Sequence, residues 1–155
     1  MDTQTHFSPC GRYRYALSKV WDADKPSVMI VGLNPSKTDD NPTITRCTNF
    51  AQSWGFGGVH VTNLFAFRAA TPDELITASE PIGKENDEWL TRCAQKSGLT
   101  VAAWGNYGSH LKRSDQVKRL LPDLHYIQMN KSGEPAHPLY LKASLMPVKL
   151  PVQHR

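Results

Sequence analysis

Apolar and polar residues follow one another along this chain in short blocks that predict β-strands separated by α-helices. The strands are predicted over residues 12–17, 28–33, 59–64, 99–104 and 124–127. The block at 28–33 is a continuous apolar run, typical of a buried central strand, whereas residues 12–17 alternate as an edge strand does. Strands that alternate with helices favour an α/β protein, a three-layer α/β/α sandwich around a mainly parallel sheet, with an N-terminal edge strand or hairpin.

The first predicted helix has the clearest signals. Asn41 is a suitable N-cap, Pro42 suits the first helical position, and Gly55 marks the end. Its apolar stripe consists of Ile44, Cys47, Phe50, Ala51 and Trp54. The spacing of three and four residues predicts that this helix packs one face against the sheet. Further helices are predicted to begin at Thr71 and at Asn86, to run over about 109–121, and to follow a loop at 135–141.

The composition is that of an ordinary globular protein, and we expect residues 1–155 to form one domain. Hydrophobic residues make up 39% and charged residues 21% of the chain, and no apolar stretch approaches the length of a membrane span. The three cysteines form no C-x-x-C pair and the six histidines show no ligand spacing, so we expect neither disulfides nor a metal site. The first residues lack the basic-then-apolar order of a signal peptide, so a cytoplasmic protein is expected. We also expect the protein to be a monomer.

Three asparagines and a histidine follow the predicted strands where they end. Asn34 comes after the strand at 28–33, Asn63 lies at the end of the next, Asn106 follows the third, and His137 follows the last after a loop. The carboxyl ends of parallel strands meet at one edge of a sheet, and ligands bind there. We therefore expect a neutral, amide-rich site that suits the edge of a heterocycle, with Phe65 and Trp54 as candidate apolar walls.

Each of these residues also has a purely structural interpretation. Asn34 stands in an Asn-Pro dipeptide, which is common in turns, and Asn63 could satisfy the backbone at a strand end. His137 could bond to a carbonyl within a loop, and Phe65 could belong to the core. Ser36 has no evident histidine–aspartate relay, so no activated nucleophile is predicted.

The net charge of +4 and the sequence pI near 9.0 are compatible with an anionic partner such as nucleic acid. Candidates for contact with backbone phosphate are Arg46, Arg68 and Lys131. The two arginines could instead pair with acidic neighbours, which are Asp39, Asp40 and Asp73. A solvated helix face would give similar charge counts. The chain has no G-x-G-x-x-G and no Walker lysine motif, which excludes dinucleotide and P-loop nucleotide sites of the usual kind.

Six motifs spread over nearly the whole chain resemble those of one family. They are Arg12-Tyr13-x-Tyr15-x-Leu17, Gly32-Leu33-Asn34-Pro35-Ser36, Asn63-Leu64-Phe65-Ala66-Phe67-Arg68, Gly83-x-Glu85-Asn86-Asp87, Trp104-Gly105 and Gly133-x-Pro135-x-His137-Pro138-Leu139-Tyr140. The chain is identified by them as similar to domain-of-unknown-function family 1643, a family of bacteria and phages. This resemblance implies no particular activity.

A more distant resemblance does imply one. Gly32-Leu33-Asn34-Pro35-Ser36 resembles the first motif of the mismatch-specific uracil and thymine DNA glycosylases, which reads Gly-Ile-Asn-Pro-Gly. Residues 41–56 resemble their next helix, residues 58–68 the strand and arginine-containing turn after it, and 137–139 their second motif. The resemblance implies the uracil-DNA glycosylase-like fold, with a central four-stranded parallel sheet and helices on both faces, and no metal or cofactor.

The same resemblance implies a role for each residue of the site. Asn34 would position the attacking water, Asn63 would lie near the flipped base, and His137 near the base oxygen that gains charge. The substrate-binding residues would be Gly32, Leu33, Pro35, Ser36 and Asn63, with Phe65 or Trp54 stacking. The first motif departs from the acidic type because it has no Asp or Glu, and the second lacks the Ser that follows His-Pro.

We therefore expect a nucleobase-recognising protein that binds DNA or a nucleotide. The sharper hypothesis is a DNA glycosylase-like hydrolase that cleaves an N-glycosidic bond at a uracil-like or modified pyrimidine. One alternative is a hydrolase of free nucleosides or nucleotides, which turns over without DNA. The other is a non-catalytic DNA-binding module, which binds with a steep salt dependence but releases no base.

Overall fold

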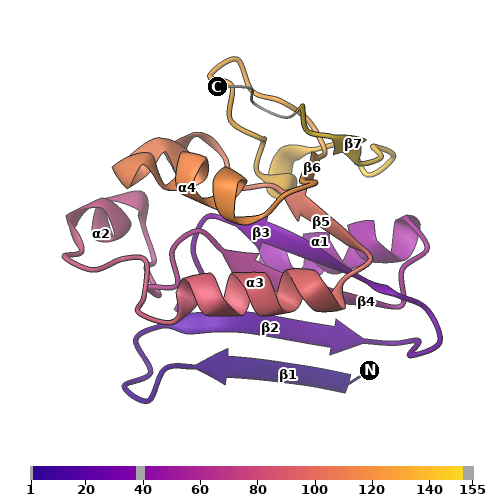
Figure 1. Ribbon diagram of the computed structural model, residues 1–155, viewed down its shortest axis with the longest axis horizontal. Helices are drawn as coiled ribbons and strands as arrows, with labels where there is room; N and C mark the ends of the chain where they lie inside the picture. Colours follow the sequence, from indigo (N-terminus) through magenta and orange to yellow (C-terminus); the bar gives the residue numbers. More distant parts are fainter. Residues whose placement is uncertain (1, 38–40, 152–155) are drawn as a thin grey trace.

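The computed structural model describes residues 2–37 and 41–151, and a seven-stranded sheet runs through them (Figure 1). The strands are β1 Asp2–Phe7, β2 Arg14–Val20, β3 Ser27–Gly32, β4 Gly58–Asn63, β5 Leu99–Ala102, β6 His125–Tyr126 and β7 Val148–Lys149. Their order across the sheet is β1-β2-β4-β3-β5-β6-β7. The neighbours β4, β3, β5 and β6 pair in parallel, and the other pairs are antiparallel. The chain is thus an α/β protein, as the alternation of elements predicts.

The sheet is wider than the expected four-stranded one because antiparallel strands extend it at both edges. Residues 12–17 were predicted as an edge strand, but β2 is covered on its outer side by β1. The edge strand β1 has the sequence DTQTHF and is mostly exposed. Since an exposed strand needs no apolar face, its polar sequence contains no alternation from which it could be predicted.

In the described part of the chain, four α-helices and two 3-10 helices accompany the strands. They are α1 Pro42–Ser53, α2 Pro72–Thr77, α3 Asn86–Lys96, η1 Asn106–Lys112, α4 Arg113–Leu120 and η2 Pro138–Tyr140. The predicted start of α1 is confirmed, since the Asn41 side chain accepts a hydrogen bond from the Ile44 N–H at 3.1 Å. The predicted helix over 109–121 is wrong in its first part, because left-handed residues Leu111 (φ 56°) and Lys112 (φ 55°) separate η1 from α4. Residues 138–149 form η2 and β7 where a C-terminal helix was expected.

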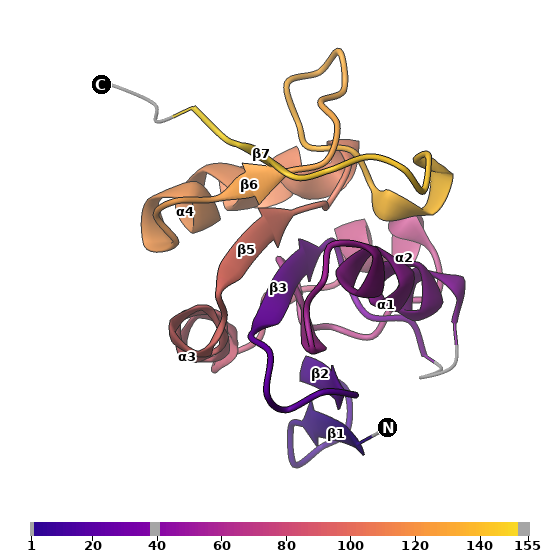
Figure 2. The ribbon, with the colours of Figure 1, turned by 90° about the vertical axis from the view of Figure 1, so that its right-hand side faces the viewer.

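Helices cover both faces of the sheet, α1 on one side and α3 and α4 on the other (Figure 2). Residues of β3 alternate between the two layers: Val28 and Ile30 pack with α1, whereas Met29 and Val31 pack with α3 and α4. All four are fully buried. The continuous apolar run that predicted this strand is therefore explained by a core on each face.

Candidate functional site

The parallel strands bring the predicted rim residues to one edge of the sheet. Gly32 at the end of β3 is paired in register with Asn63 at the end of β4, and Val31 with Ala102 at the end of β5. The segments that carry Asn34 and Gly105 leave the sheet directly beyond these pairs. The expected convergence of strand ends is thus present, with the order Asn63, Gly32 and Gly105 across the edge.

Asn63 is buried at this edge, with 4% of its surface exposed, yet its side-chain Nδ2 has no hydrogen-bond partner among the described residues. Its side chain lies beside Gly32, where an added Cβ would stand only 2.9 Å from Asn63 Oδ1. Glycine at position 32 therefore makes room for the amide. A buried donor without a partner costs about 1 to 3 kcal/mol, so Asn63 Nδ2 is an N–H donor that a ligand acceptor could satisfy.

Asn34 is half-buried and is held by its own amide group. Its Nδ2 donates to the carbonyl of Pro35 at 2.9 Å and to that of Ala69 at 3.0 Å. These bonds join the loop after β3 to the loop after β4. Both amide protons are used, so Asn34 Oδ1 is the atom left to accept a hydrogen bond, as from a water molecule.

The other residues of the predicted first motif form the support of Asn34. Pro35 is buried and its carbonyl accepts a hydrogen bond from Ala69 N–H at 3.2 Å. Leu33 packs against the core under α3 and α4, and Ser36 Oγ accepts from Asn41 Nδ2 at 3.0 Å. The motif is therefore fixed at both ends of its loop, by the core and by the N-cap of α1.

His137 is the N-cap of η2, where its Nδ1 accepts a hydrogen bond from the Leu139 N–H at 3.3 Å. An accepting Nδ1 places the ring proton on Nε2, and burial lowers the pKa of His137 below its ordinary value. The imidazole is thus neutral at pH 7 and offers an N–H donor. Gly105 takes φ +79°, and an added Cβ there would stand 3.5 Å from His137 Cβ, so the histidine packs directly on the end of β5.

A buried network holds the segment before His137. Glu134, which is 8% exposed, accepts hydrogen bonds from Trp104 Nε1 at 3.0 Å and from Ser114 Oγ at 2.9 Å. The turn after β6 is tied to Asn106, whose Oδ1 accepts from Asn130 Nδ2 at 2.9 Å and from Ser132 Oγ at 2.6 Å. Asn106, predicted as part of the rim, thus has its acceptor occupied by this turn.

The two predicted aromatic walls lie elsewhere. Phe65 is fully buried in the core under α3 and α4, with its ring 5.6 Å from that of His110. Trp54 caps the far end of α1, about 18 Å along a helix of 12 residues, where Nε1 donates to the Leu145 carbonyl. Their apolar character reflects packing. The exposed ring near His137 belongs instead to Tyr140, which is 90% exposed at the end of η2.

The three predicted phosphate contacts occupy three separate places. Arg46 donates from Nε to the Pro138 carbonyl at 3.3 Å and lines a cavity of about 420 Å³ next to η2. Lys131 is exposed in the turn after β6. Arg68 donates to the carbonyls of Gly11 and Lys37 and does not pair with Asp73. Asp39 and Asp40 lie outside the described residues.

Within residues 2–37 and 41–151 no cluster of three histidine, cysteine or acidic side chains is arranged to hold a metal ion. In the same part of the chain no helix has the length and apolar character needed to cross a bilayer.

Comparison with known proteins gives one match. The profile of a family described as protein of unknown function (DUF1643) matches residues 14–139, which span most of the chain. No curated protein and no solved structure matches. The resemblance to the DNA glycosylases therefore stays a prediction from the sequence.

Proposed function

The chain belongs to this family of proteins of unknown function (DUF1643), and from its own residues we propose that it recognises a nucleobase at the carboxyl edge of its sheet and cleaves an N-glycosidic bond. The substrate we propose is a uracil-like or modified pyrimidine in DNA. The observation that carries this proposal is the buried Nδ2 of Asn63, which has no partner among the described residues and lies at the same edge as Asn34 and His137. A base carbonyl is the kind of acceptor that fills such a donor.

Three groups then act on one substrate. Asn34 Oδ1 accepts a hydrogen bond from a water whose oxygen bonds to the sugar C1′ as the bond from C1′ to the base nitrogen breaks. The electron pair of that bond leaves with the base, and the proton lost by the water passes to solvent. His137 donates its Nε2 proton in a hydrogen bond to the base oxygen that gains charge, while Asn63 Nδ2 reads a second acceptor.

The proposed chemistry relies on the leaving group more than on the nucleophile. The motif at residues 32–36 contains no carboxylate, so no strong general base stands next to the water. Neutral donors fixed before the reaction stabilise the developing anion without reorganisation. The fixed Nδ1 bond of His137 and the loop bonds of Asn34 are consistent with such pre-organisation.

The arrangement of the central strands also supports this proposal. Within the seven-stranded sheet, the parallel strands β4-β3-β5-β6 with helices on both faces are compatible with the four-stranded parallel sheet that the resemblance to uracil-DNA glycosylases implies. In this interpretation β1, β2 and β7 are additions at the edges. The fold alone does not establish an activity, so the weight rests on the site.

The test is base release from labelled oligonucleotides that carry uracil, mismatched thymine or a modified pyrimidine. The variants are Asn34→Ala and Asn34→Asp, which lose the same two N–H donors to Pro35 and Ala69; because Asp also faces these carbonyls with a negative charge, thermal unfolding of both variants is measured alongside. Only Asn34→Asp keeps an oxygen for the water. We expect Asn34→Ala to lower the rate about a hundredfold and Asn34→Asp to retain release.

Equal loss in both variants would assign Asn34 a structural role and remove it from the mechanism. Binding without release by the unmodified protein would favour the DNA-binding module. Release from free nucleotides without DNA would favour the nucleotide hydrolase.

A further inference from the structure

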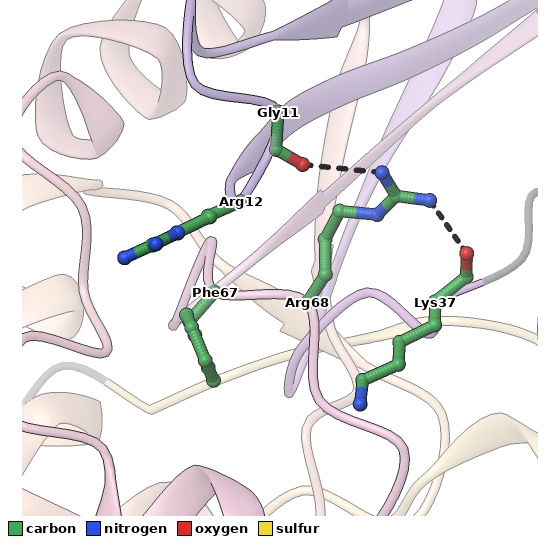
Figure 3. A pocket seen from close by; sticks show the side chains of 5 residues that line it. All are labelled: Gly11, Arg12, Lys37, Phe67 and Arg68. Carbon is green, nitrogen blue, oxygen red and sulfur yellow. Dashed lines mark hydrogen bonds between the residues drawn. The ribbon is translucent and has the colours of Figure 1, made fainter.

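A cavity of about 400 Å³ lies beside the loop that holds Asn34 (Figure 3). The described residues that line it are Gly11, Arg12, Lys37, Phe67 and Arg68. They come from the connection between β1 and β2, the loop after β3 and the loop after β4. Three of the five are cationic, although these segments are far apart in the sequence.

The positive charge of this cavity is only partly neutralised. Arg68 donates to the carbonyls of Gly11 at 3.2 Å and Lys37 at 2.6 Å, which carry no net charge, and its buried Nε has no partner among the described residues. No carboxylate among the described residues lies within ion-pair distance of Arg12. Lys37 pairs with Glu74 at 3.3 Å, but both side chains are more than a third exposed, so solvent screens the pair.

The cavity is also held in shape by bonds between its walls. The Arg68 N–H donates to the Arg12 carbonyl at 2.9 Å, and the Arg68 guanidinium lies over the Phe7 ring at 4.9 Å. Phe67 packs edge-on against Tyr13, with ring centroids 5.9 Å apart. These contacts therefore fix the backbone segments that carry the cationic side chains.

We propose that this cavity binds a phosphate group of a nucleotide or of a nucleic-acid strand. Arg12 and Lys37 contact the phosphate, and Arg68 supplies a fixed positive charge behind them. The cavity adjoins the base site because Ala69, the residue after Arg68, accepts the hydrogen bond from Asn34. Assignment of the phosphate to a nucleotide rests on the proposed function, whereas the anion site does not.

The first experiment titrates inorganic phosphate into the full chain and follows the arginine Nε–Hε signals by NMR. Arg12→Gln and Lys37→Gln each remove one exposed cation without breaking a backbone bond. The matched control is Lys25→Gln, because Lys25 is 58% exposed and paired with Asp22, much as Lys37 is 60% exposed and paired with Glu74.

We expect saturable binding that weakens about tenfold in Arg12→Gln and in Lys37→Gln and is unchanged in Lys25→Gln. Arg12→Lys should recover most of the affinity because it restores the charge. Equal weakening in all three glutamine variants, or no saturable binding by the unmodified chain, overturns the proposal. Thermal unfolding of each variant checks that it is folded.

A competition experiment then distinguishes the two sources of phosphate. A nucleoside 5′-monophosphate that displaces inorganic phosphate identifies a free nucleotide, and a short single-stranded oligonucleotide that does so identifies a strand. Displacement by neither overturns the assignment to nucleotides.

The pocket and the glycosylase activity can fail separately. Phosphate binding without base release from any substrate would retain the cavity and remove the proposed reaction. Base release that is the same in Arg12→Gln, Lys37→Gln and Lys25→Gln would retain the reaction and remove the cavity from it.

Discussion

Two arginines near the segment after β4 differ in how their charge is paired: Arg113 lies in the buried region at the start of α4, and Arg68 lies in the loops at the carboxyl edge of the sheet. Arg113 is 1% exposed and donates to Asp87 Oδ1 at 2.6 Å and to the Leu64 carbonyl at 2.8 Å. Among the described residues Arg68 donates hydrogen bonds only to backbone carbonyls, and no carboxylate pairs with its charge. The pairing of Arg113 is what a buried charge requires for stability. The incomplete pairing of Arg68 is the observation on which the proposed phosphate site rests.

Two buried asparagines show the same contrast. Asn86, at the start of α3, donates from Nδ2 to the carbonyls of Asn63 and Leu64 at 2.9 and 3.0 Å, although its Oδ1 has no partner among the described residues. The Nδ2 of Asn63, in contrast, donates no hydrogen bond to any described residue. The Asn86 donor thus holds backbone segments together, whereas the Asn63 donor has no partner among the described residues and is the group that we propose reads the base.

Replacement of the two arginines by methionine should give the largest difference between the regions. Arg113→Met removes the bonds to Asp87 and Leu64 and should lower the free energy of unfolding by about 3 to 4 kcal/mol. Arg68→Met should cost about 1 kcal/mol in stability, because solvent and backbone can replace its bonds, but should weaken phosphate binding about tenfold. Urea unfolding measures the first effect and a phosphate titration the second. Equal destabilisation would contradict the division into two regions.

Two glycines offer the next test. An added Cβ at Gly108 would stand 2.2 Å from Cδ1 of the buried Trp104 ring, so Gly108→Ala should destabilise the fold by about 2 to 3 kcal/mol. At Gly32 the Cβ would meet only the end of the Asn63 side chain, at 2.9 Å. Gly32→Ala should therefore cost about 1 kcal/mol, because Asn63 can move, but that movement removes the base donor. Urea unfolding should show the larger loss of stability in Gly108→Ala, and the base-release assay should show the larger loss of activity in Gly32→Ala.

Local signals allowed the sequence to predict most of the fold. The cap at Asn41, the start of a helix at Thr71 and the apolar run at 28–33 all depend on signals within a few residues, and each is confirmed. The polar strand β1 and the break at Leu111 were not predicted. The first is fixed by pairing with β2, and the second by a left-handed turn that no glycine marks.

Much less of the candidate site was predictable from the sequence. Strand ends have a common position in any parallel sheet, so Asn34, Asn63 and His137 could be grouped in advance. The sequence could not predict that Arg12 and Lys37 line one cavity with Arg68, because this cavity depends on three loops that meet only in the folded chain. Phe65 was misplaced because an aromatic residue next to a site looks the same in the sequence whether it faces a ligand or the core.

The two regions also contain histidines whose protonation opposes folding. Burial lowers the pKa of His137 at the edge and of His60 in β4 below the ordinary 6.5, with the charge of Lys96 adding to the effect at His60. Below pH 6.5 the unfolded chain therefore binds protons that the folded chain does not. We expect the contribution of these two neutral histidines to the free energy of unfolding to be complete above pH 6.5 and to decrease as the pH falls below that value. Unfolding at pH 7.5 and 5.5 should show a smaller difference in His60→Gln and in His137→Gln, and an unchanged difference in both would contradict the burial.

The smallest expected effect is on thiol reactivity, which differs between the exposed Cys10, next to Arg12, and the buried Cys47 and Cys93. The Ser8 hydroxyl, 3.3 Å from the sulfur, is the main cause that lowers the pKa of the exposed Cys10 thiol; the backbone N–H of Arg12 lowers this pKa further, and the charge of Arg12 adds a smaller effect. Burial raises the pKa of Cys47 to about 12 and also raises that of Cys93. Iodoacetamide should therefore alkylate only Cys10 in the folded protein, as peptide mass spectrometry can check.

Ser8→Ala should slow this alkylation more than Arg12→Gln does, because the hydroxyl is the larger cause of the lowered pKa of Cys10. Saturating phosphate should slow it by about twofold, because an anion beside Arg12 cancels the charge that favours the thiolate. The phosphate effect should vanish in Arg12→Gln but persist in Lys25→Gln. Alkylation that ignores phosphate in the unmodified protein would mean that the anion does not reach Arg12, and the contrast between Arg68 and Arg113 would then reflect packing alone.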